Sequence, residues 1–312
     1  MDYIEEIKGL KEQMTFLEGI EFPESVRNIV MAGMGGSGIA GKIFQEIYTK
    51  KPVALTDSYS IPDFVNEDTL FIGVSYSGNT EETLAATNLA MKRGARVSAI
   101  TSGGKLGETV KDAVIIPKGL QPRSAIGYLL NPVLVGAGFD VSNFNETREV
   151  LSRMDEDRRE FEQIAAEIGQ YRKTPVVYGT PPFSTIAYRI KTQFNENSKI
   201  ISYWSYFPEL NHNDTVALEN DYRKDEFYFM VLRSSFTSEE VARRIKVTSD
   251  LCKIKFREIS AEGYSLISQL YSLIHKGDYI SYYLAKLRNI DPRDVSIIER
   301  LKTELSNVDT NK

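Results

Sequence analysis

The chain has 312 residues, of which 42% are hydrophobic and 26% charged, and it carries a net charge of −5 with an isoelectric point near 5.4. This composition is typical of a soluble globular protein with room for two domains, and the acidic balance argues against a nucleic-acid partner. A single cysteine, Cys252, excludes an internal disulfide, and with only two histidines no metal site is expected.

The first residues predict a leading helix, because apolar side chains recur at helical spacing over residues 1–20 (Ile4, Ile7, Leu10, Met14, Leu17). This charged, amphipathic start is unlike a signal peptide. The longest apolar stretch, residues 125–139, is too short to span a bilayer and contains Asn131 and Pro132. We therefore expect a cytoplasmic protein with no membrane partner.

An alternation of strands and helices follows. Apolar strand candidates lie at 28–33, 52–57, 69–77, 95–101 and 113–117, and helix candidates lie at 38–50, 79–93 and 104–111. Because these strands are apolar throughout, they indicate a parallel sheet that is covered by helices on both faces.

The second half repeats this pattern after a polar, charge-dense stretch at 141–163, which we interpret as a connection that becomes a helix. Strand candidates lie at 174–179, 199–204, 226–235 and 255–260, and helix candidates at 184–195 and 238–252. A long helix, a break at Asp291-Pro292 and a final helix end the chain. The prediction is an α/β protein with two αβα sandwiches, residues 1–150 and 151–312, the second of which includes the C-terminal helices.

The first candidate binding loop is Gly33-x-Gly35-x-x-Gly38, which stands between an apolar strand and a helix as in dinucleotide-binding proteins. Asp57 lies 19 residues beyond Gly38, where such a fold places its ribose-binding acid. The loop alone leaves both a dinucleotide and a smaller phosphate open.

The second candidate loop brings the hydroxyls of Ser75, Ser77 and Thr80 into six residues. Asn79 is a plausible N-cap, and Glu82 completes a pattern that resembles a capping box, so a helix is expected to begin here. Hydroxyl and backbone donors at a helix N-terminus suit a phosphate monoester. The alternative is an ordinary capped helix after a serine-rich turn.

Together the two loops, "GMGGSG" and "SYSGNTEET", resemble the sugar isomerase (SIS) domains, which bind phosphosugars. The segments "RIKTQFNENSK" (189–199), "FPELNHND" (207–214) and "YYLAKLRNIDPRDVSIIERLK" (282–302) are similar to the bifunctional phosphoglucose/phosphomannose isomerases. This resemblance covers both halves. It implies two SIS-type subdomains and a cofactor- and metal-independent isomerase, which interconverts glucose 6-phosphate and mannose 6-phosphate with fructose 6-phosphate through an enediol(ate). Asp57 then becomes a strand-end residue.

Aldose–ketose isomerisation needs a base and a group that stabilises the enediolate. A carboxylate can move the proton between C1 and C2, and the resemblance assigns this role to Glu196. It assigns the oxyanion role to Arg123, whose fixed positive charge suits it. On sequence alone, a surface glutamate that caps a turn is the better interpretation of Glu196, and a surface arginine is as compatible with Arg123 as the oxyanion role.

Ring opening needs its own acid–base groups, which the resemblance assigns to His212 and Lys302. The equivalent histidine of the superfamily reaches the site from the partner subunit, so a homodimer is implied. His275, in a helix, is interpreted as structural. The phosphate would bind Gly35, Gly36, Ser37, Ser75, Ser77 and Thr80. The family's threonine near the last helix is missing here, which leaves the relative rates on the two aldoses open.

Three other functions compete with isomerisation. An NAD-dependent oxidoreductase would use the Gly33 loop and Asp57, but it lacks a second supporting signature. A non-catalytic phosphosugar sensor would need a partner module, for which no extra sequence is seen. A glucosamine-6-phosphate synthase would need an N-terminal cysteine nucleophile, and Cys252 lies in the wrong place.

Overall fold

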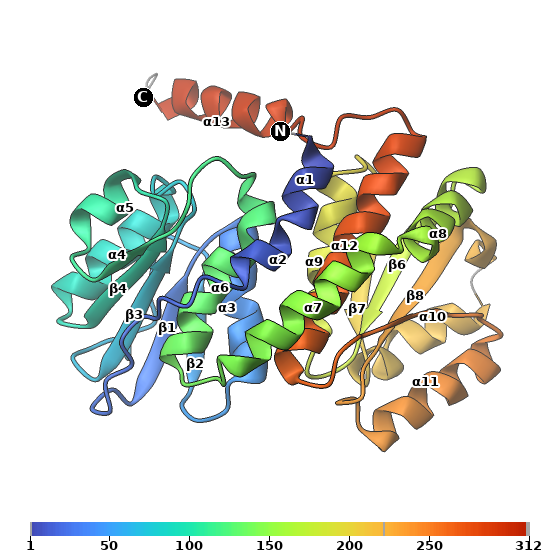
Figure 1. The fold of residues 1–312 in the computed structure, drawn as a ribbon, viewed down its shortest axis with the longest axis horizontal. Helices are drawn as coiled ribbons and strands as arrows, with labels where there is room; N and C mark the ends of the chain where they lie inside the picture. The colour runs from blue at the N-terminus through green and yellow to red at the C-terminus, as the bar shows by residue number, and fades with distance from the viewer. Residues whose placement is uncertain (1, 221, 310–312) are drawn as a thin grey trace.

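Two parallel sheets form the frame of the protein (Figure 1). A computed structural model describes residues 2–220 and 222–309, with backbone alone for residues 302 and 305–309. The strand order is β2-β1-β3-β4-β5 in the first sheet and β7-β6-β8-β9 in the second, and all neighbours are parallel. The strands are β1 (Asn28–Ala32), β2 (Val53–Thr56), β3 (Thr69–Val74), β4 (Arg96–Thr101), β5 (Ala113–Ile115), β6 (Thr174–Gly179), β7 (Tyr203–Tyr206), β8 (Phe227–Arg233) and β9 (Arg257–Ser260). The predicted fold class is confirmed.

Helices cover both faces of the first sheet. Ile29 and Met31 of β1 belong to the core that includes α3 (Gly35–Ile47) and α6 (Ile126–Gly136). Val30 and Ala32 point to the opposite face, where α4 (Glu81–Lys92) packs. Strand β3 is buried along its whole length, as expected for a strand that is covered on both sides.

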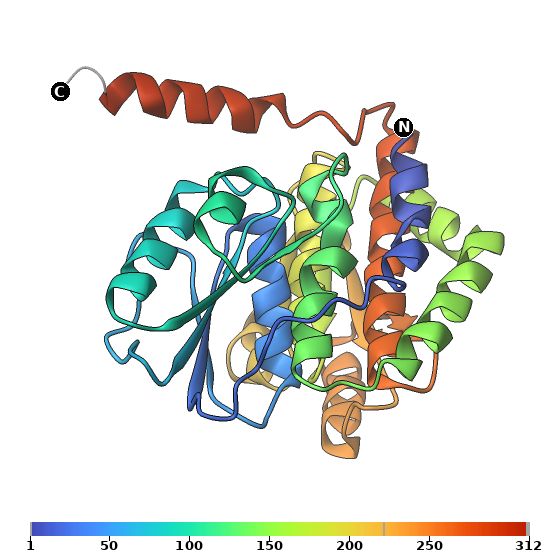
Figure 2. The ribbon, with the colours of Figure 1, turned by 60° about the vertical axis from the view of Figure 1, so that its left-hand side comes forward.

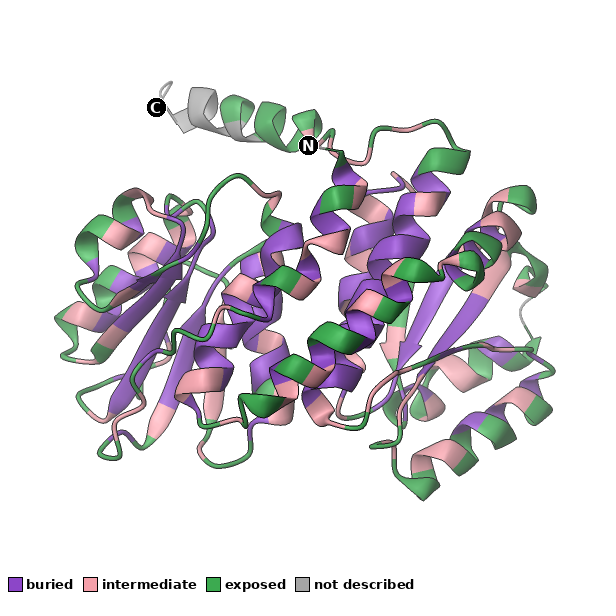
Figure 3. Ribbon diagram, in the orientation of Figure 1, coloured by how far each residue is buried: buried purple, intermediate pink, exposed green. Residues whose placement is uncertain are grey.

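The second sheet is covered in the same way. Its inner face packs against α8 (Arg159–Gln170), α9 (Ser184–Glu196) and α12 (Leu266–Leu287), and its outer face against α10 (Asp214–Asn220) and α11 (Glu239–Cys252). The helices α7 (Ser142–Glu156), α9 and α12 lie between the two sheets, and α12 is buried over most of its length (Figure 3). One apolar core therefore joins both halves. The predicted division at residue 150 falls within α7 and stays a prediction.

The remaining elements are short or peripheral. They are α1 (Tyr3–Lys8), α2 (Leu10–Gln13), α5 (Gly104–Thr109), η1 (Pro122–Ala125), η2 (Glu209–His212), η3 (Lys224–Glu226) and α13 (Ser296–Asp309). The final helix α13 extends away from the rest of the molecule (Figure 2), and its Ile297 and Leu301 are exposed. No helix in the described ranges is long and apolar enough to cross a membrane.

The predicted single leading helix is wrong. The chain forms α1 and α2, which meet at Gly9, and helical structure ends at Gln13. The Gln13 side chain donates to the Ser124 carbonyl at 2.7 Å, and the chain then follows α6, where Ile20 N donates to the Pro132 carbonyl at 3.0 Å. Contacts with α6 thus override the helical periodicity of residues 15–20.

Two other boundaries also differ from expectation. The stretch 141–163, interpreted as a connection that becomes a helix, is almost entirely helical, with α7 beginning at Ser142 and α8 at Arg159. The strand predicted at 199–204 begins only at Tyr203, because the chain first turns through Lys199, which has a left-handed φ of 53°.

Candidate active site

The two candidate loops meet at the carboxyl ends of β1 and β3. The Ser37 hydroxyl, at the start of α3, accepts a hydrogen bond from Tyr76 N at 3.2 Å. Gly35 has a positive φ of 52°, which favours glycine. A Cβ on Gly36 would lie 3.3 Å from the Arg123 Cα, so a side chain there would press on Arg123. The β1–α3 loop is therefore fitted against both the second loop and the arginine.

The β3–α4 loop presents hydroxyls in front of a helix. Ser75 Oγ and Thr80 Oγ1 are 2.9 Å apart, and Gly78 N donates to Ser75 Oγ at 3.1 Å. Ser77 is exposed. No side chain caps the N-terminus of α4, so its first backbone N–H groups can receive an anion.

The predicted cap of α4 is wrong. Thr80, not Asn79, occupies the N-cap position, and neither residue caps the helix with its side chain. Asn79 Oδ1 instead accepts from Lys105 N at 3.2 Å, and its Nδ2 donates to the Ser77 carbonyl at 3.2 Å. Asn79 therefore ties the loop to α5 through its amide oxygen, while its amide nitrogen bonds within the loop.

Arg123 lies on η1 and is only 5% exposed. Its Nε donates to Asn197 Oδ1 at 2.9 Å, and its Nη2 donates to the Pro292 carbonyl at 2.7 Å. The Tyr3 ring lies under the guanidinium, whose Cζ is 5.1 Å from the ring centroid. The guanidinium group is thus fixed by contacts with three segments that are far apart in the sequence.

Glu196 is the last residue of α9, and its Oε2 lies 3.3 Å from Arg123 Nη1. The other end of this helix is also fixed, because Glu46 accepts from Ser184 N at 2.6 Å and from Thr185 N at 2.8 Å. Lys199 donates to the Glu196 carbonyl, which caps the helix. Burial, with a further contribution from the Arg123 charge, lowers the pKa of Lys199.

A buried ion pair supports this arrangement from below. Arg189 on α9 donates to both carboxylate oxygens of Asp278 on α12, at 2.6 and 3.1 Å. Its Nη2 also donates to the Arg123 carbonyl at 3.0 Å. Breaking a buried ion pair leaves an uncompensated charge, so the pair with Asp278 fixes the position of Arg189. The bond from Arg189 to the Arg123 carbonyl then fixes the backbone of η1.

A small cavity brings some of the predicted residues together. It has a volume of about 30 Å³, and Gly35, Gly36, Arg123 and Glu196 line it. Ser75, Ser77 and Thr80 do not line this cavity, and Ser37 lines a different one. His212 is exposed on η2 and is not among the described residues that line this cavity. The side chain of Lys302, on α13, lies outside the described residues.

Several residues of the site were missed from the sequence. Arg189 and Gln193 lie seven and three residues before Glu196, which places them on the same face of α9, and this spacing could have found both. Asn197, next to Glu196, is fully buried, which no local pattern of this polar segment indicates. No local pattern could have identified the Pro292 carbonyl, because any residue has one.

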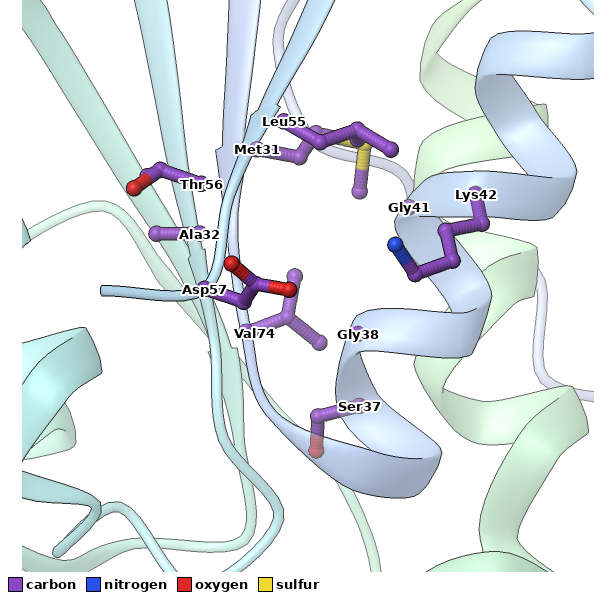
Figure 4. A pocket seen from close by; sticks show the side chains of 11 residues that line it. Met31, Ala32, Ser37, Gly38, Gly41, Lys42, Leu55, Thr56, Asp57 and Val74 are labelled. Carbon is purple, nitrogen blue, oxygen red and sulfur yellow. The ribbon is translucent and has the colours of Figure 1, made fainter. Parts of the chain in front are cut away.

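Asp57 follows the end of β2, as expected, and lines a second cavity with the glycine loop. Figure 4 shows Asp57 and Lys42 reaching toward the same space, which has a volume of about 160 Å³. Over the described ranges, no three His, Cys, Asp or Glu side chains are grouped as a metal site requires.

Comparisons with known proteins agree with this geometry. Residues 24–117 match the SIS domain family, and residues 158–305 match the bacterial phospho-glucose isomerase C-terminal SIS domain family. A bifunctional phosphoglucose/phosphomannose isomerase from Thermoplasma acidophilum is 52% identical over 307 residues, which cover 98% of each chain. One with the same description from Thermoplasma volcanium is 51% identical, over 98% of this chain and 100% of the relative.

A solved structure described as a glucose-6-phosphate isomerase, from Chlamydia trachomatis D/UW-3/Cx, has a TM-score of 0.70. The likeness covers 99% of this chain and 74% of that chain, with 14% sequence identity. At this identity the likeness shows the fold alone.

Proposed function

Because the chain belongs to the family of bifunctional phosphoglucose/phosphomannose isomerases, we propose that it interconverts glucose 6-phosphate and mannose 6-phosphate with fructose 6-phosphate. The reaction would pass through an enediol(ate) and need no metal or cofactor. The observation that carries this proposal is the buried guanidinium of Arg123, held 3.3 Å from the Glu196 carboxylate at one cavity.

The substrate phosphate would bind where the two loops meet. Ser37, Ser75, Ser77 and Thr80 supply hydroxyls, and Gly35 and Gly36 allow close approach of the backbone. Support comes from the uncapped start of α4, because a dianion gains hydrogen bonds and a favourable helix dipole there. With the phosphate at this end, the C1 and C2 carbons would lie at the mouth of the cavity, next to Arg123 and Glu196.

Glu196 would take the proton from C2 of the aldose and return it to C1 of the ketose. Arg123 would stabilise the oxyanion that develops when this proton leaves. Support comes from its fixed orientation, since a donor that is already in place does not have to reorganise during the reaction. The bond from Arg123 Nη1 also orients the Glu196 carboxylate.

His212 would serve ring opening from the partner subunit of a homodimer, together with Lys302. The edge strand β7, just before η2, supports this assignment because Tyr203, Trp204 and Tyr206 are 55%, 38% and 36% exposed. Exposed aromatic residues on an edge strand suit pairing with a second copy of the chain. The predicted cytoplasmic location stays a prediction.

A coupled assay on both aldose phosphates, with the wild type and Glu196→Gln, tests the proposed function. The substitution keeps the shape and removes the base, so we expect kcat to fall by about 10²–10⁴ while KM changes little. Activity should also survive EDTA. Wild-type protein with no turnover on either aldose, or an active Glu196→Gln variant, would contradict the proposal.

A further inference from the structure

Gln193 is a buried residue that the mechanism above does not use. It lies on α9 one turn before Glu196, is 1% exposed, and lines the same cavity as Glu196 and Arg123. Its Nε2 donates to Asp278 Oδ1 at 2.8 Å. Because a carboxylate only accepts, this bond fixes which side of the amide is nitrogen and which is oxygen.

The amide oxygen of Gln193 has no hydrogen-bond partner among the described residues. A buried acceptor without a partner is costly, so native proteins rarely keep one without a reason. The bond to Asp278 engages only the nitrogen of the amide, so the oxygen takes no part in the ion pair. The residue is therefore a fixed acceptor beside the two groups assigned to proton transfer.

The size of the cavity limits what can reach this acceptor. A volume of about 30 Å³ holds one group of the size of a water molecule. A hydroxyl in the middle of a sugar chain cannot enter, because carbon atoms flank it on both sides. The C1 end of an open-chain ketose can enter, since only its hydroxyl lies beyond the carbon.

We propose that Gln193 Oε1 accepts a hydrogen bond from the C1 hydroxyl of the ketose phosphate, with Asp278 fixing the amide for this contact. The inference rests on the proposed function and names a further residue that contacts the substrate. In the enediol the C1 oxygen also carries a proton, whereas in the aldehyde it does not. Gln193 therefore favours the ketose and the enediol over the aldehyde.

The test compares fructose 6-phosphate with 1-deoxyfructose 6-phosphate, which lacks only the C1 hydroxyl. Affinities are measured by calorimetry in the Glu196→Gln background, where no turnover intervenes. We expect fructose 6-phosphate to bind at least about tenfold more tightly, the ratio that corresponds to one hydrogen bond to a buried group. Adding Gln193→Met should reduce the ratio below about threefold, by weakening fructose 6-phosphate alone.

Thr192→Val is the matched control. Thr192 lines the same cavity, but its hydroxyl donates to the Arg189 carbonyl at 2.7 Å, so the tenfold ratio should persist. An unchanged ratio in Gln193→Met, or equal binding of the two sugars when Gln193 is intact, overturns the inference. The second outcome needs no change at residue 193 and so does not depend on the variant folding. Failure of Glu196→Gln to bind fructose 6-phosphate at all would instead overturn the proposed function, and the inference with it.

Discussion

The four proposed catalytic residues divide into an inner pair and an outer pair. The inner pair, Arg123 and Glu196, lies together at one cavity within a single chain. The outer pair, His212 and Lys302, lies on η2 and α13, and neither element contributes a described residue to the lining of this cavity. In the proposed mechanism, proton transfer therefore needs only a folded chain, whereas ring opening would need assembly or movement of α13.

The difference follows from how each pair is held. Arg123 is fixed by Asn197, by the Pro292 carbonyl and by the Arg189 contact to its own backbone. His212 follows an edge strand with exposed aromatic side chains, and its own side chain is exposed. A group that lacks such support cannot be positioned to within a fraction of an ångström by its own chain.

Arg123→Lys has the largest effect expected on the inner pair. A lysine keeps the charge, but it cannot donate at once to Asn197, Glu196 and Pro292 in the planar geometry of the fork. We expect kcat to fall by about 10²–10³ with a smaller change in KM, as for loss of an oxyanion donor. Steady-state kinetics on fructose 6-phosphate measures both kcat and KM.

Lys199→Arg is the control for this substitution, because it also replaces one cationic side chain near Glu196 by another. Among the described residues, the hydrogen bonds of the Lys199 side chain go to backbone carbonyls, those of Glu196 and Pro292. The kcat of Lys199→Arg should stay within a few-fold of the wild type. An Arg123→Lys variant that retains full kcat would show that charge alone suffices, and the proposed importance of the fixed fork would then be wrong.

His212→Ala tests the outer pair and has a smaller expected effect, because sugar rings also open without catalysis. We expect a loss of about 10–10² in kcat, at the low end for general acid–base catalysis. Dimers that carry one Glu196→Gln chain and one His212→Ala chain can be purified through two affinity tags. If His212 acts across the interface, one of their two sites is intact, so about half of the wild-type activity should return.

The opposite result is equally clear. If each chain uses its own His212, both sites of the mixed dimer lack one essential group, and its activity should be no higher than that of the His212→Ala parent. If the chains did not pair, no mixed dimer would be retained through both affinity tags. Measuring the molar mass of the wild type in solution shows independently whether the chains pair.

The sequence predicted the first sheet closely because its strands are short apolar runs bounded by turn residues. Strand β1 was expected at 28–33 and is found at Asn28–Ala32. The leading helix failed because its end is decided by contacts with α6, which the local pattern does not contain. Asn79 failed for the same reason, since its amide bonds to α5 in preference to its own helix.

The candidate site was predictable where a residue type and its spacing carry the chemistry. The hydroxyls of the β3–α4 loop are an example, whereas Glu196 and Arg123 were assigned by the resemblance. Residues that orient other residues were not predictable, because their partners are far apart in the chain. Arg123 and Asn197 are separated by 74 positions, and Arg123 and the Pro292 carbonyl by 169. Tertiary structure alone brings them together.

A substitution of Asp155 has the smallest expected effect. It tests whether the contacts between α7 and α12 contribute to the stability of the fold independently of Arg123 and Glu196. On α7, Asp155 accepts from Lys11 Nζ at 3.0 Å, contacts His275 Nε2 at 2.9 Å, and accepts from the Tyr279 hydroxyl. His275 is buried on α12, in agreement with its predicted structural role. Burial opposes ionisation of Asp155, but hydrogen bonds, first that from His275, outweigh it and lower its pKa.

The sign of the pH effect follows from this lowered pKa. Between the native pKa and the ordinary value near 3.9, the unfolded chain binds more protons than the native one, so the free energy of unfolding rises with pH. The contribution of Asp155 is fully present above this window and is lost as pH falls through it. We therefore expect Asp155→Asn to destabilise the protein at pH 6 more than at pH 3, as measured by urea unfolding. Asp250→Asn, at an exposed position on α11, should leave the pH profile unchanged. Equal destabilisation by Asp155→Asn at both pH values would mean that its carboxylate acts through packing rather than charge.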